Sequence, residues 1–184
     1  MKFTEARIKG VYIVDIEMLE DERGFFAREW CQREFSNQGL NSNLAQSSIS
    51  FNKKRGTLRG MHYQIPPYQE AKLVRCVKGS IYDVIIDLRP DSSTFGEHFA
   101  MELNSENYKM LYIPENFAHG FLTLSDNTEI DYKISQFYSP GSARGIRWND
   151  PYFNISWPSE PSVISAKDSS YPDFIPEMAH KILS

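Results

Sequence analysis

Apolar and polar residues alternate along the chain in a way that predicts many short β-strands. The clearest pattern covers residues 128–138, where every second residue is suited to one face; these are Thr128, Ile130, Tyr132, Ile134, Gln136 and Tyr138. Alternate residues of a strand point to the same side of the sheet. The pattern therefore predicts a half-buried strand on which Tyr132 and Tyr138 point inward together.

Other segments show strand-like patterns of similar length. Residues 72–78 and 80–88 flank the turn at Lys78, Gly79 and Ser80, and the second of these segments has apolar residues on both faces. Residues 108–114 and 117–124 predict two more strands, with Pro114 and Asn116 marking the loop between them. Helix signals are few: residues 31–40 predict about two turns that end at Gly39, and the tail 172–184 predicts one more helix.

Many short strands at close spacing are typical of an antiparallel sandwich or barrel. We therefore predict an all-β protein, a jelly-roll antiparallel β-sandwich or barrel with a few short helices, whose interior can hold a ligand. The 184 residues suit one domain with a full core, so we expect a single domain over residues 1–184.

Charge is distributed unevenly along the chain. The formal net charge is −4 and the pI is about 5.6, yet seven Lys and Arg residues lie between Lys53 and Lys78 against the single acid Glu70. A local field of opposite sign indicates either an anion-binding site or a solvated basic edge, and the sequence leaves both open. The basic stretch does not extend over the chain, so we do not expect nucleic acid as a partner.

Several classes of protein lose support from the sequence. The N-terminal residues have no apolar signal region and no segment approaches the length of a membrane span, so we expect a cytoplasmic protein without a membrane partner. Cys31 and Cys76 are too few for a disulfide framework and predict buried free thiols. Dinucleotide, P-loop and zinc-protease motifs are absent from the sequence.

Two histidines lie in predicted strands near the basic stretch. His119 is flanked on its strand face by Phe117 and Phe121, which is typical of a hydrogen-bonded core histidine. His62 precedes Tyr63 and Gln64, and a neutral amide at position 64 is a poor ligand for a transition metal. We therefore predict a metal-free site. A histidine without a metal can act as a general base, and the cations near His62 suit an anionic substrate.

The chain resembles the dTDP-4-dehydrorhamnose 3,5-epimerases over nearly its whole length. The similarity rests on an ordered series of motifs: "DERGFF" at 21–26, "GTLRGMHYQIPP" at 56–67, "AKLVRCVKG" at 71–79, "DLRPDSSTFG" at 87–96, "IPENFAHGFLTL" at 113–124, "IRWNDP" at 146–151, "ISWP" at 155–158 and "SAKD" at 165–168. The resemblance implies a cupin-like jelly roll, a homodimer, a nucleotide-sugar substrate, and neither metal nor cofactor.

The resemblance also implies roles for the residues that would move protons on a 4-keto sugar. His62 corresponds to the base, Asp168 to the carboxylate that orients it, and Lys72 to the group that stabilises charge on the C4 oxygen. Tyr132 corresponds to the acid on the opposite face of the sugar. His119 corresponds to a substrate contact, which changes the interpretation of that residue as part of the core only.

A second group of residues corresponds to family positions that bind the nucleotide. Arg23 and Arg59 match diphosphate contacts, Tyr138 matches a residue that stacks on the base, and Gln46 and Lys167 match further binding positions. The sequence departs from the family at Arg28, Ser48 and Ala143, and we include Ser48 among the expected substrate contacts. These departures bear on the nucleotide and on the sugar configuration.

Two alternatives to a 3,5-epimerase of dTDP-4-dehydro-6-deoxyglucose stay open at this point. One is a mono-epimerase, or an epimerase for another nucleotide sugar. The other is a non-catalytic jelly-roll module that binds a nucleotide sugar or a glycan, which would need neither a base nor an acid.

Overall fold

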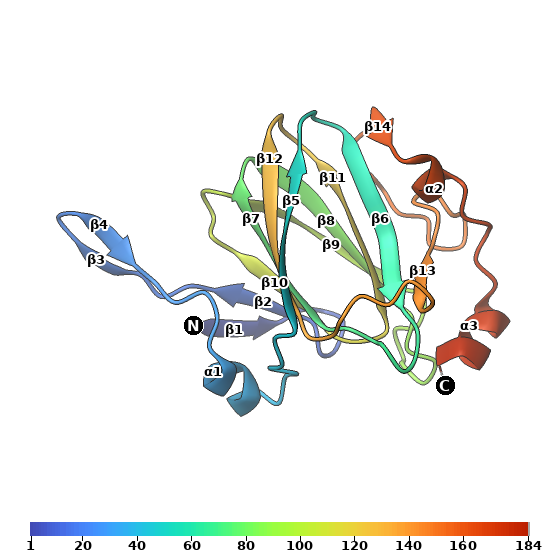
Figure 1. The fold of residues 1–184 in the computed structure, drawn as a ribbon, viewed down its shortest axis with the longest axis horizontal. Helices are drawn as coiled ribbons and strands as arrows, with labels where there is room; N and C mark the ends of the chain where they lie inside the picture. Colours follow the sequence, from blue (N-terminus) through green and yellow to red (C-terminus); the bar gives the residue numbers. More distant parts are fainter. Residues whose placement is uncertain (184) are drawn as a thin grey trace.

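Two antiparallel β-sheets face each other in the computed structural model, which describes residues 1–183 apart from the side chains of residues 179, 180 and 182 (Figure 1). The first sheet has the strand order β1 (Lys2–Glu5), β2 (Tyr12–Asp15), β10 (Met110–Ile113), β7 (Lys72–Lys78), β12 (Thr128–Ile134) and β5 (Gln46–Asn52). The second has the order β13 (Ala143–Gly145), β6 (Thr57–Gln64), β11 (Phe117–Thr123), β8 (Ser80–Asp87) and β9 (His98–Asn104). A short strand, β14 (Val163–Ile164), pairs with β6 in parallel.

The main core lies between these two sheets. Strands β7, β10 and β12 of the first sheet and β8 and β11 of the second contribute fully buried side chains to one cluster, among them Val74, Leu111, Ile130, Ile85 and Phe121. Burial of this much apolar surface is the dominant stabilising contribution to a fold of this size. The sandwich of antiparallel strands predicted from the sequence is confirmed.

Strands β7 and β8 follow each other in the chain but belong to different sheets. The chain turns between them at Gly79, whose φ of 77° is in the left-handed region that favours glycine. A Cβ there would lie 2.5 Å from the Ser125 hydroxyl, so the turn also has no room for a side chain. The connection therefore carries the chain from one layer of the sandwich to the other, as in a jelly roll.

Strand β8 is buried on both faces, as its apolar residues predict. Ile81 and Ile85 point into the sandwich, whereas Val84 and Ile86 pack against the C-terminal part of the chain, where they meet Phe153. The C-terminal segment thus covers the outer face of the second sheet (Figure 1).

The helices are short, as expected. Helix α1 (Gln32–Asn37) is followed by Gly39 with a φ of 72°, and its Phe35 packs against the outer face of the first sheet. Helix α3 (Pro176–Leu183) forms in the predicted tail, while Ser184 lies outside the described residues. Helix α2 (Ala166–Ser169) is not predicted from the sequence pattern. In residues 1–183 no helix has the length and apolar character needed to cross a membrane.

A hairpin projects from one side of the sandwich (Figure 1). It consists of β3 (Leu19–Asp21) and β4 (Gly24–Phe26), which pair only with each other. Leu19 and Phe26 are directly opposite each other on the two strands, and they are 70% and 72% exposed. Such an exposed apolar pair on a projecting arm is unusual for a surface that meets only water.

Candidate active site

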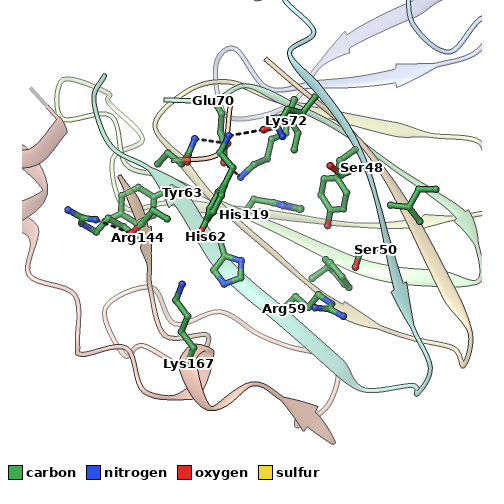
Figure 2. A pocket seen from close by; sticks show the side chains of 18 of the residues that line it. Ser48, Ser50, Arg59, His62, Tyr63, Glu70, Lys72, His119, Arg144 and Lys167 are labelled. Atoms are coloured by element: carbon green, nitrogen blue, oxygen red, sulfur yellow. Dashed lines mark hydrogen bonds and ion pairs between the residues drawn. The ribbon is translucent and has the colours of Figure 1, made fainter. Parts of the chain in front are cut away.

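A cavity of about 480 Å³ opens between the two sheets, and residues of both sheets line it (Figure 2). Its walls include nine of the eleven residues expected at the site: Gln46, Ser48, Arg59, His62, Lys72, His119, Tyr132, Tyr138 and Lys167. A tenth, Asp168, lies directly behind His62. The sandwich thus brings together residues that are more than 100 positions apart in the chain.

His62 and Asp168 form a hydrogen-bonded pair in the wall of the cavity. The Nε2 atom of His62 lies 2.7 Å from Oδ1 of Asp168, and the backbone N–H of Gly60 donates to the other carboxylate oxygen at 3.3 Å. Burial opposes ionisation of Asp168, but the hydrogen bond to His62 and that from Gly60 hold the pKa of the carboxyl below its usual value. The carboxylate therefore fixes the imidazole and leaves its other nitrogen available to a ligand.

Local structure explains how Asp168 reaches His62. Strand β14 runs beside β6, and Ser165 then caps helix α2 by accepting a hydrogen bond from the N–H of Asp168 at 3.0 Å. The Ser165 cap fixes the first turn so that the side chain of Asp168 points to β6. The motif "SAKD" thus forms the N-cap and first turn of helix α2, and this turn positions the Asp168 carboxylate.

Close packing of β6 against β11 determines the position of His62. Gly60 has a φ of 121°, and a Cβ on it would lie 2.5 Å from the Cα of Gly120. His119 of β11 pairs directly with His62 of β6. The register of the two strands then shifts between His119 and Phe121, at the contact with Gly60. Glycine is therefore required at position 60 for the two histidines to occupy neighbouring positions on adjacent strands.

His119 makes a second histidine–carboxylate pair, deeper in the protein. Its Nε2 atom lies 2.7 Å from Oδ1 of Asp83, and both side chains are almost completely buried. The other oxygen of Asp83 has no hydrogen-bond partner among the described residues. His119 is therefore a buried, hydrogen-bonded residue that also forms part of the cavity wall, and its contact with a substrate stays a prediction.

Tyr132 faces the histidines from the opposite sheet. Its ring meets that of His119 edge-on, with 5.9 Å between the ring centroids. Burial raises the pKa of the Tyr132 phenol above its ordinary value, and the nearby Asp83 carboxylate raises it further. The hydroxyl therefore stays neutral in the resting protein.

Lys72, Glu70 and Gln64 form a connected polar group at one end of the cavity. The Nζ atom of Lys72 lies 2.8 Å from Oε1 of Glu70, and Gln64 donates to the other oxygen of Glu70 at 3.0 Å. Gln64 also donates to the carbonyl of Tyr68 at 2.8 Å and accepts from the N–H of Ser139 at 2.6 Å. The Gln64 side chain therefore connects two loops of the cavity wall.

The described residues contain no group of three His, Cys, Asp or Glu side chains arranged to hold a metal ion. Gln64 stands at the position considered for a metal ligand. Its side-chain amide is already hydrogen-bonded to the backbone of Tyr68 and Ser139. The absence of a metal requirement stays a prediction.

The other end of the cavity is cationic. Arg59 and Lys167 lie on the opposite side of His62 from Glu70 and Lys72 (Figure 2). The Nε atom of Arg59 donates to Asn52 at 2.8 Å, and neither cation forms an ion pair with a carboxylate of the described residues. This end can therefore accept an anion at two charged side chains.

Polar and aromatic groups at the mouth complete the cavity. Tyr138 is 61% exposed, and its backbone N–H donates to the side chain of Gln46 at 2.7 Å. Tyr138 lies beyond the end of β12 at Ile134, so the predicted strand was four residues too long, yet the residue still lines the cavity. Ser48 lines the cavity from β5, where it pairs with Tyr132 of β12 (Figure 2).

Arg23 is the expected site residue that the structure does not bring to this cavity. It lies in the turn of the projecting hairpin, where its guanidinium binds Asp21 of the same hairpin. The basic stretch is likewise divided: Arg59 and Lys72 line the cavity, whereas Lys53, Lys54 and Arg55 are exposed. The solvated edge therefore describes Lys53, Lys54 and Arg55, while an anion site at the cavity stays a prediction.

Sequence reasoning missed three residues of the site. Asp83 supports His119, Glu70 pairs with Lys72, and Tyr171 stands edge-on to His62 with 6.4 Å between ring centroids. A carboxylate inside the apolar run 81–88 was a usable signal for Asp83, because a buried charge needs a partner. No local pattern marks Tyr171, which reaches the cavity only because Gly145 leaves room for its ring.

Comparison with known proteins agrees with this geometry. The sequence profile of the dTDP-4-dehydrorhamnose 3,5-epimerases matches residues 5–175. The chain belongs to this family. A dTDP-4-dehydrorhamnose 3,5-epimerase of Shigella flexneri is 42% identical over 95% of this chain and 97% of its own length. The predicted family and the assignment as an isomerase are confirmed.

Solved structures extend the similarity to the fold. The epimerase of Elizabethkingia anophelis is 38% identical and superposes with a TM-score of 0.91 over 95% of this chain and 96% of its own. A Legionella pneumophila epimerase in complex with dTDP-4-keto-L-rhamnose is 33% identical, with a TM-score of 0.85 over 92% and 90%. ChmJ, a 3'-monoepimerase of Streptomyces bikiniensis in complex with dTDP-quinovose, is 27% identical, with the same TM-score over 96% and 88%.

Proposed function

We propose that this family member epimerises a nucleotide-linked 4-keto-6-deoxyhexose, converting dTDP-4-dehydro-6-deoxyglucose to dTDP-4-dehydrorhamnose. The observation that carries the proposal is the His62–Asp168 pair, which faces a cavity with a partly buried phenol, that of Tyr132, on the opposite sheet. Epimerisation needs a base and an acid on the two faces of one sugar ring, and the two sheets supply one each. The substrate is supported by the Legionella relative that holds dTDP-4-keto-L-rhamnose.

The first step is removal of a proton next to the keto group. C3 and C5 are both adjacent to the C4 carbonyl, so loss of either proton sends the bonding electron pair onto the C4 oxygen and gives an enolate. His62 takes the proton, and Asp168 holds the imidazole in place and stabilises its positive charge. Lys72 stabilises the developing negative charge on the oxygen.

Inversion is completed when a proton arrives from the other face. Tyr132 donates its hydroxyl proton to the carbon, the electron pair returns from the oxygen, and the keto group is restored. Solvent then returns a proton to Tyr132 and removes the one on His62, so the enzyme ends in its starting state. His119, bonded to Asp83 beside Tyr132, contacts the sugar.

The nucleotide occupies the cationic end and the mouth. Arg59 and Lys167 bind the diphosphate, since charge-assisted hydrogen bonds to phosphate oxygens are strong. Tyr138 stacks on the base, with Gln46 and Ser48 beside it. In this orientation His62 lies between the phosphates and Lys72, which is where the sugar must be (Figure 2).

We infer that the protein is a homodimer in which Arg23 serves the partner's site. The hairpin of β3 and β4 carries Arg23 at its turn and exposes Leu19 and Phe26, while β5 has an unpaired edge beside the cavity with Ile49 exposed. A second copy can cover both apolar surfaces and protect the edge strand. The cytoplasmic location and the single domain over residues 1–184 also stay predictions.

Proton NMR in deuterated water tests the reaction. Purified protein with dTDP-4-keto-6-deoxyglucose, and with no added metal or cofactor, is expected to incorporate deuterium at C3 and C5 and to form the inverted sugar. A chelator should leave the rate unchanged. Loss of activity with chelator that zinc or iron restores would contradict the metal-free prediction.

The same spectra separate the alternatives. Deuterium and inversion at C3 alone would indicate a mono-epimerase, the activity named for the Streptomyces bikiniensis relative. Ligand binding without any exchange would indicate the non-catalytic module, and would contradict the assignment of His62 as a base.

A further inference from the structure

The cavity holds an ion pair for which the proposed reaction has so far used only one member. Lys72 and Glu70 lie side by side at one end of the cavity, 2.8 Å apart, and their side chains are only 9% and 11% exposed (Figure 2). This ion pair is largely shielded from solvent, and burying either charge without the other would cost desolvation free energy. Glu70 therefore compensates the charge of Lys72 in this position.

Glu70 is held firmly in this position. Gln64, itself 3% exposed, donates to Oε2 of Glu70 at 3.0 Å while its own oxygen is fixed by the N–H of Ser139. One carboxylate oxygen thus binds Gln64 and the other binds Lys72. The ammonium group is consequently pinned to one point of the wall.

The charges elsewhere in the cavity differ from this arrangement. His62 and His119 are each paired with an aspartate, whereas Arg59, Arg144 and Lys167 form no ion pair with a carboxylate of the described residues. The Arg144 guanidinium binds only the backbone carbonyls of Gly141 and Ala143 among those residues. The cavity is therefore positive where Arg59, Arg144 and Lys167 lie and nearly neutral at Lys72.

We propose that Glu70 is a specificity-determining residue that neutralises Lys72, so that a diphosphate binds at Arg59 and Lys167 and leaves the Lys72 ammonium to the keto oxygen. The proposal rests on the function proposed above. An uncompensated lysine in a shielded cavity would attract phosphate oxygens strongly and would compete with Arg59 and Lys167. A lysine whose charge is balanced by Glu70 can still donate a hydrogen bond to a developing enolate, because an ammonium group has three donors.

Binding of inorganic pyrophosphate, measured by calorimetry, tests this without depending on catalysis. Glu70→Gln keeps the size of the side chain but removes its charge, so pyrophosphate should bind about tenfold more tightly or better, because Lys72 becomes an additional phosphate contact. Glu106→Gln is the matched control: it makes the same change in net charge at an exposed residue of the β9–β10 loop and should bind as the parent does.

A double variant keeps the test decisive if a lone buried lysine prevents folding. Glu70→Gln with Lys72→Gln replaces a neutral pair by another neutral pair, so its affinity for pyrophosphate should equal that of the parent. Weaker binding by the double variant would show that Lys72 binds phosphate in the parent and would overturn the proposal. Unchanged affinity in Glu70→Gln would overturn it equally.

Deuterium exchange distinguishes this inference from the proposed function. Glu70→Gln should exchange more slowly than the parent, because the phosphates then occupy the sugar end and misplace C3 and C5, whereas Glu106→Gln should exchange normally. Exchange at the parental rate in Glu70→Gln would count against the proposal. A parent protein that does not exchange at all contradicts the proposed function, and the pyrophosphate comparison still decides the role of Glu70.

Discussion

The two histidine–aspartate pairs occupy neighbouring positions on β6 and β11 but differ in exposure. The side chain of His62 is 44% exposed to the cavity, whereas that of His119 is 5% exposed and its Asp83 is completely buried. A base must exchange its proton with substrate and solvent, which His62 can do. His119 is better suited to a fixed hydrogen bond with the sugar.

The role of His62 as base leads to a prediction about rate. His62→Ala should lower turnover by about 10²- to 10⁴-fold, the range typical of a general base, and should change nucleotide affinity far less, because Arg59 and Tyr138 remain. Steady-state turnover and calorimetry with dTDP measure the two effects. His98→Ala, on the edge strand β9 outside the cavity, is the matched control and should behave as the parent. Near-normal turnover of the His62 variant would refute the assignment.

The phenol of Tyr132 should determine stereochemistry. Tyr132→Phe keeps the partly buried ring against His119 and removes only the hydroxyl, the proposed proton donor. His62 still abstracts protons in this variant, so deuterium should enter with retained configuration while the inverted sugar falls sharply. NMR of the product in deuterated water measures both. Inverted sugar at the parental rate would show that another group or water is the acid.

Strand elements were the part of the structure that the sequence could predict. Alternation identified β12 and its inward Tyr132, and turn residues placed the ends of β7 and β8. Helix α2 was missed because four residues are too few for a periodic pattern, although the Ser165 cap was visible in the motif. The pairing of strands could not be read, because β7 and β8 are consecutive in the chain yet lie in different sheets.

Prediction of the site from the sequence was limited in the same way, because contacts between strands could not be predicted. The resemblance supplied His62, Asp168, Lys72 and Tyr132, and the cavity contains or adjoins all four. Asp83 was missed because its partner His119 lies on the adjacent strand β11, and local sequence does not encode which strands pair. Glu70 was visible as the single acid of the basic stretch, but the sequence does not show that its side chain pairs with Lys72. Side-chain partners depend on register, which only the folded sheets define.

The loop after β8 gives a prediction about acid stability. Buried Asp87 accepts hydrogen bonds from Arg89, Ser92 and Thr94; burial opposes its ionisation, but these bonds hold its pKa below the ordinary value of 3.8. A lowered folded pKa stabilises the protein above pH 3.8, and the stabilisation is lost as the pH falls below that value. Asp87→Asn should therefore lower the free energy of unfolding at pH 7 by about 1–3 kcal/mol.

Urea unfolding at pH 7 and pH 3 measures this effect. The difference between parent and Asp87→Asn should shrink at pH 3, because the Asp87 carboxyl of the unfolded chain is protonated below pH 3.8 and the stabilisation from the lowered pKa is reduced. The control Asp91→Asn changes an exposed carboxylate of the same loop and should have little effect at either pH. A difference that is the same at both pH values would contradict the explanation.

At the scale of the whole molecule, each site draws on both sheets and, as we infer, on a second chain. The proposed base His62 comes from β6, the proposed acid Tyr132 from β12, and Asp168, behind His62, from the C-terminal segment. Arg23 alone lies on the projecting hairpin, which pairs with no other strand of the described chain. If the partner delivers Arg23, this residue acts in the site of the other subunit. A mixed dimer can therefore distinguish Arg23 from the other site residues, which act in their own subunit.

Mixing two inactive variants tests delivery of Arg23 by the partner. His62→Ala removes the base of one subunit but leaves its Arg23, while Arg23→Ala leaves the base intact. In a mixed dimer, the site with His62 receives Arg23 from the other chain and should be active. Random reassociation should restore about a quarter of the parental sites, since half of the dimers are mixed and each has one complete site. Each variant alone, unfolded and refolded identically, is the control. If Arg23 serves its own chain, or if the protein is a monomer, mixing restores nothing.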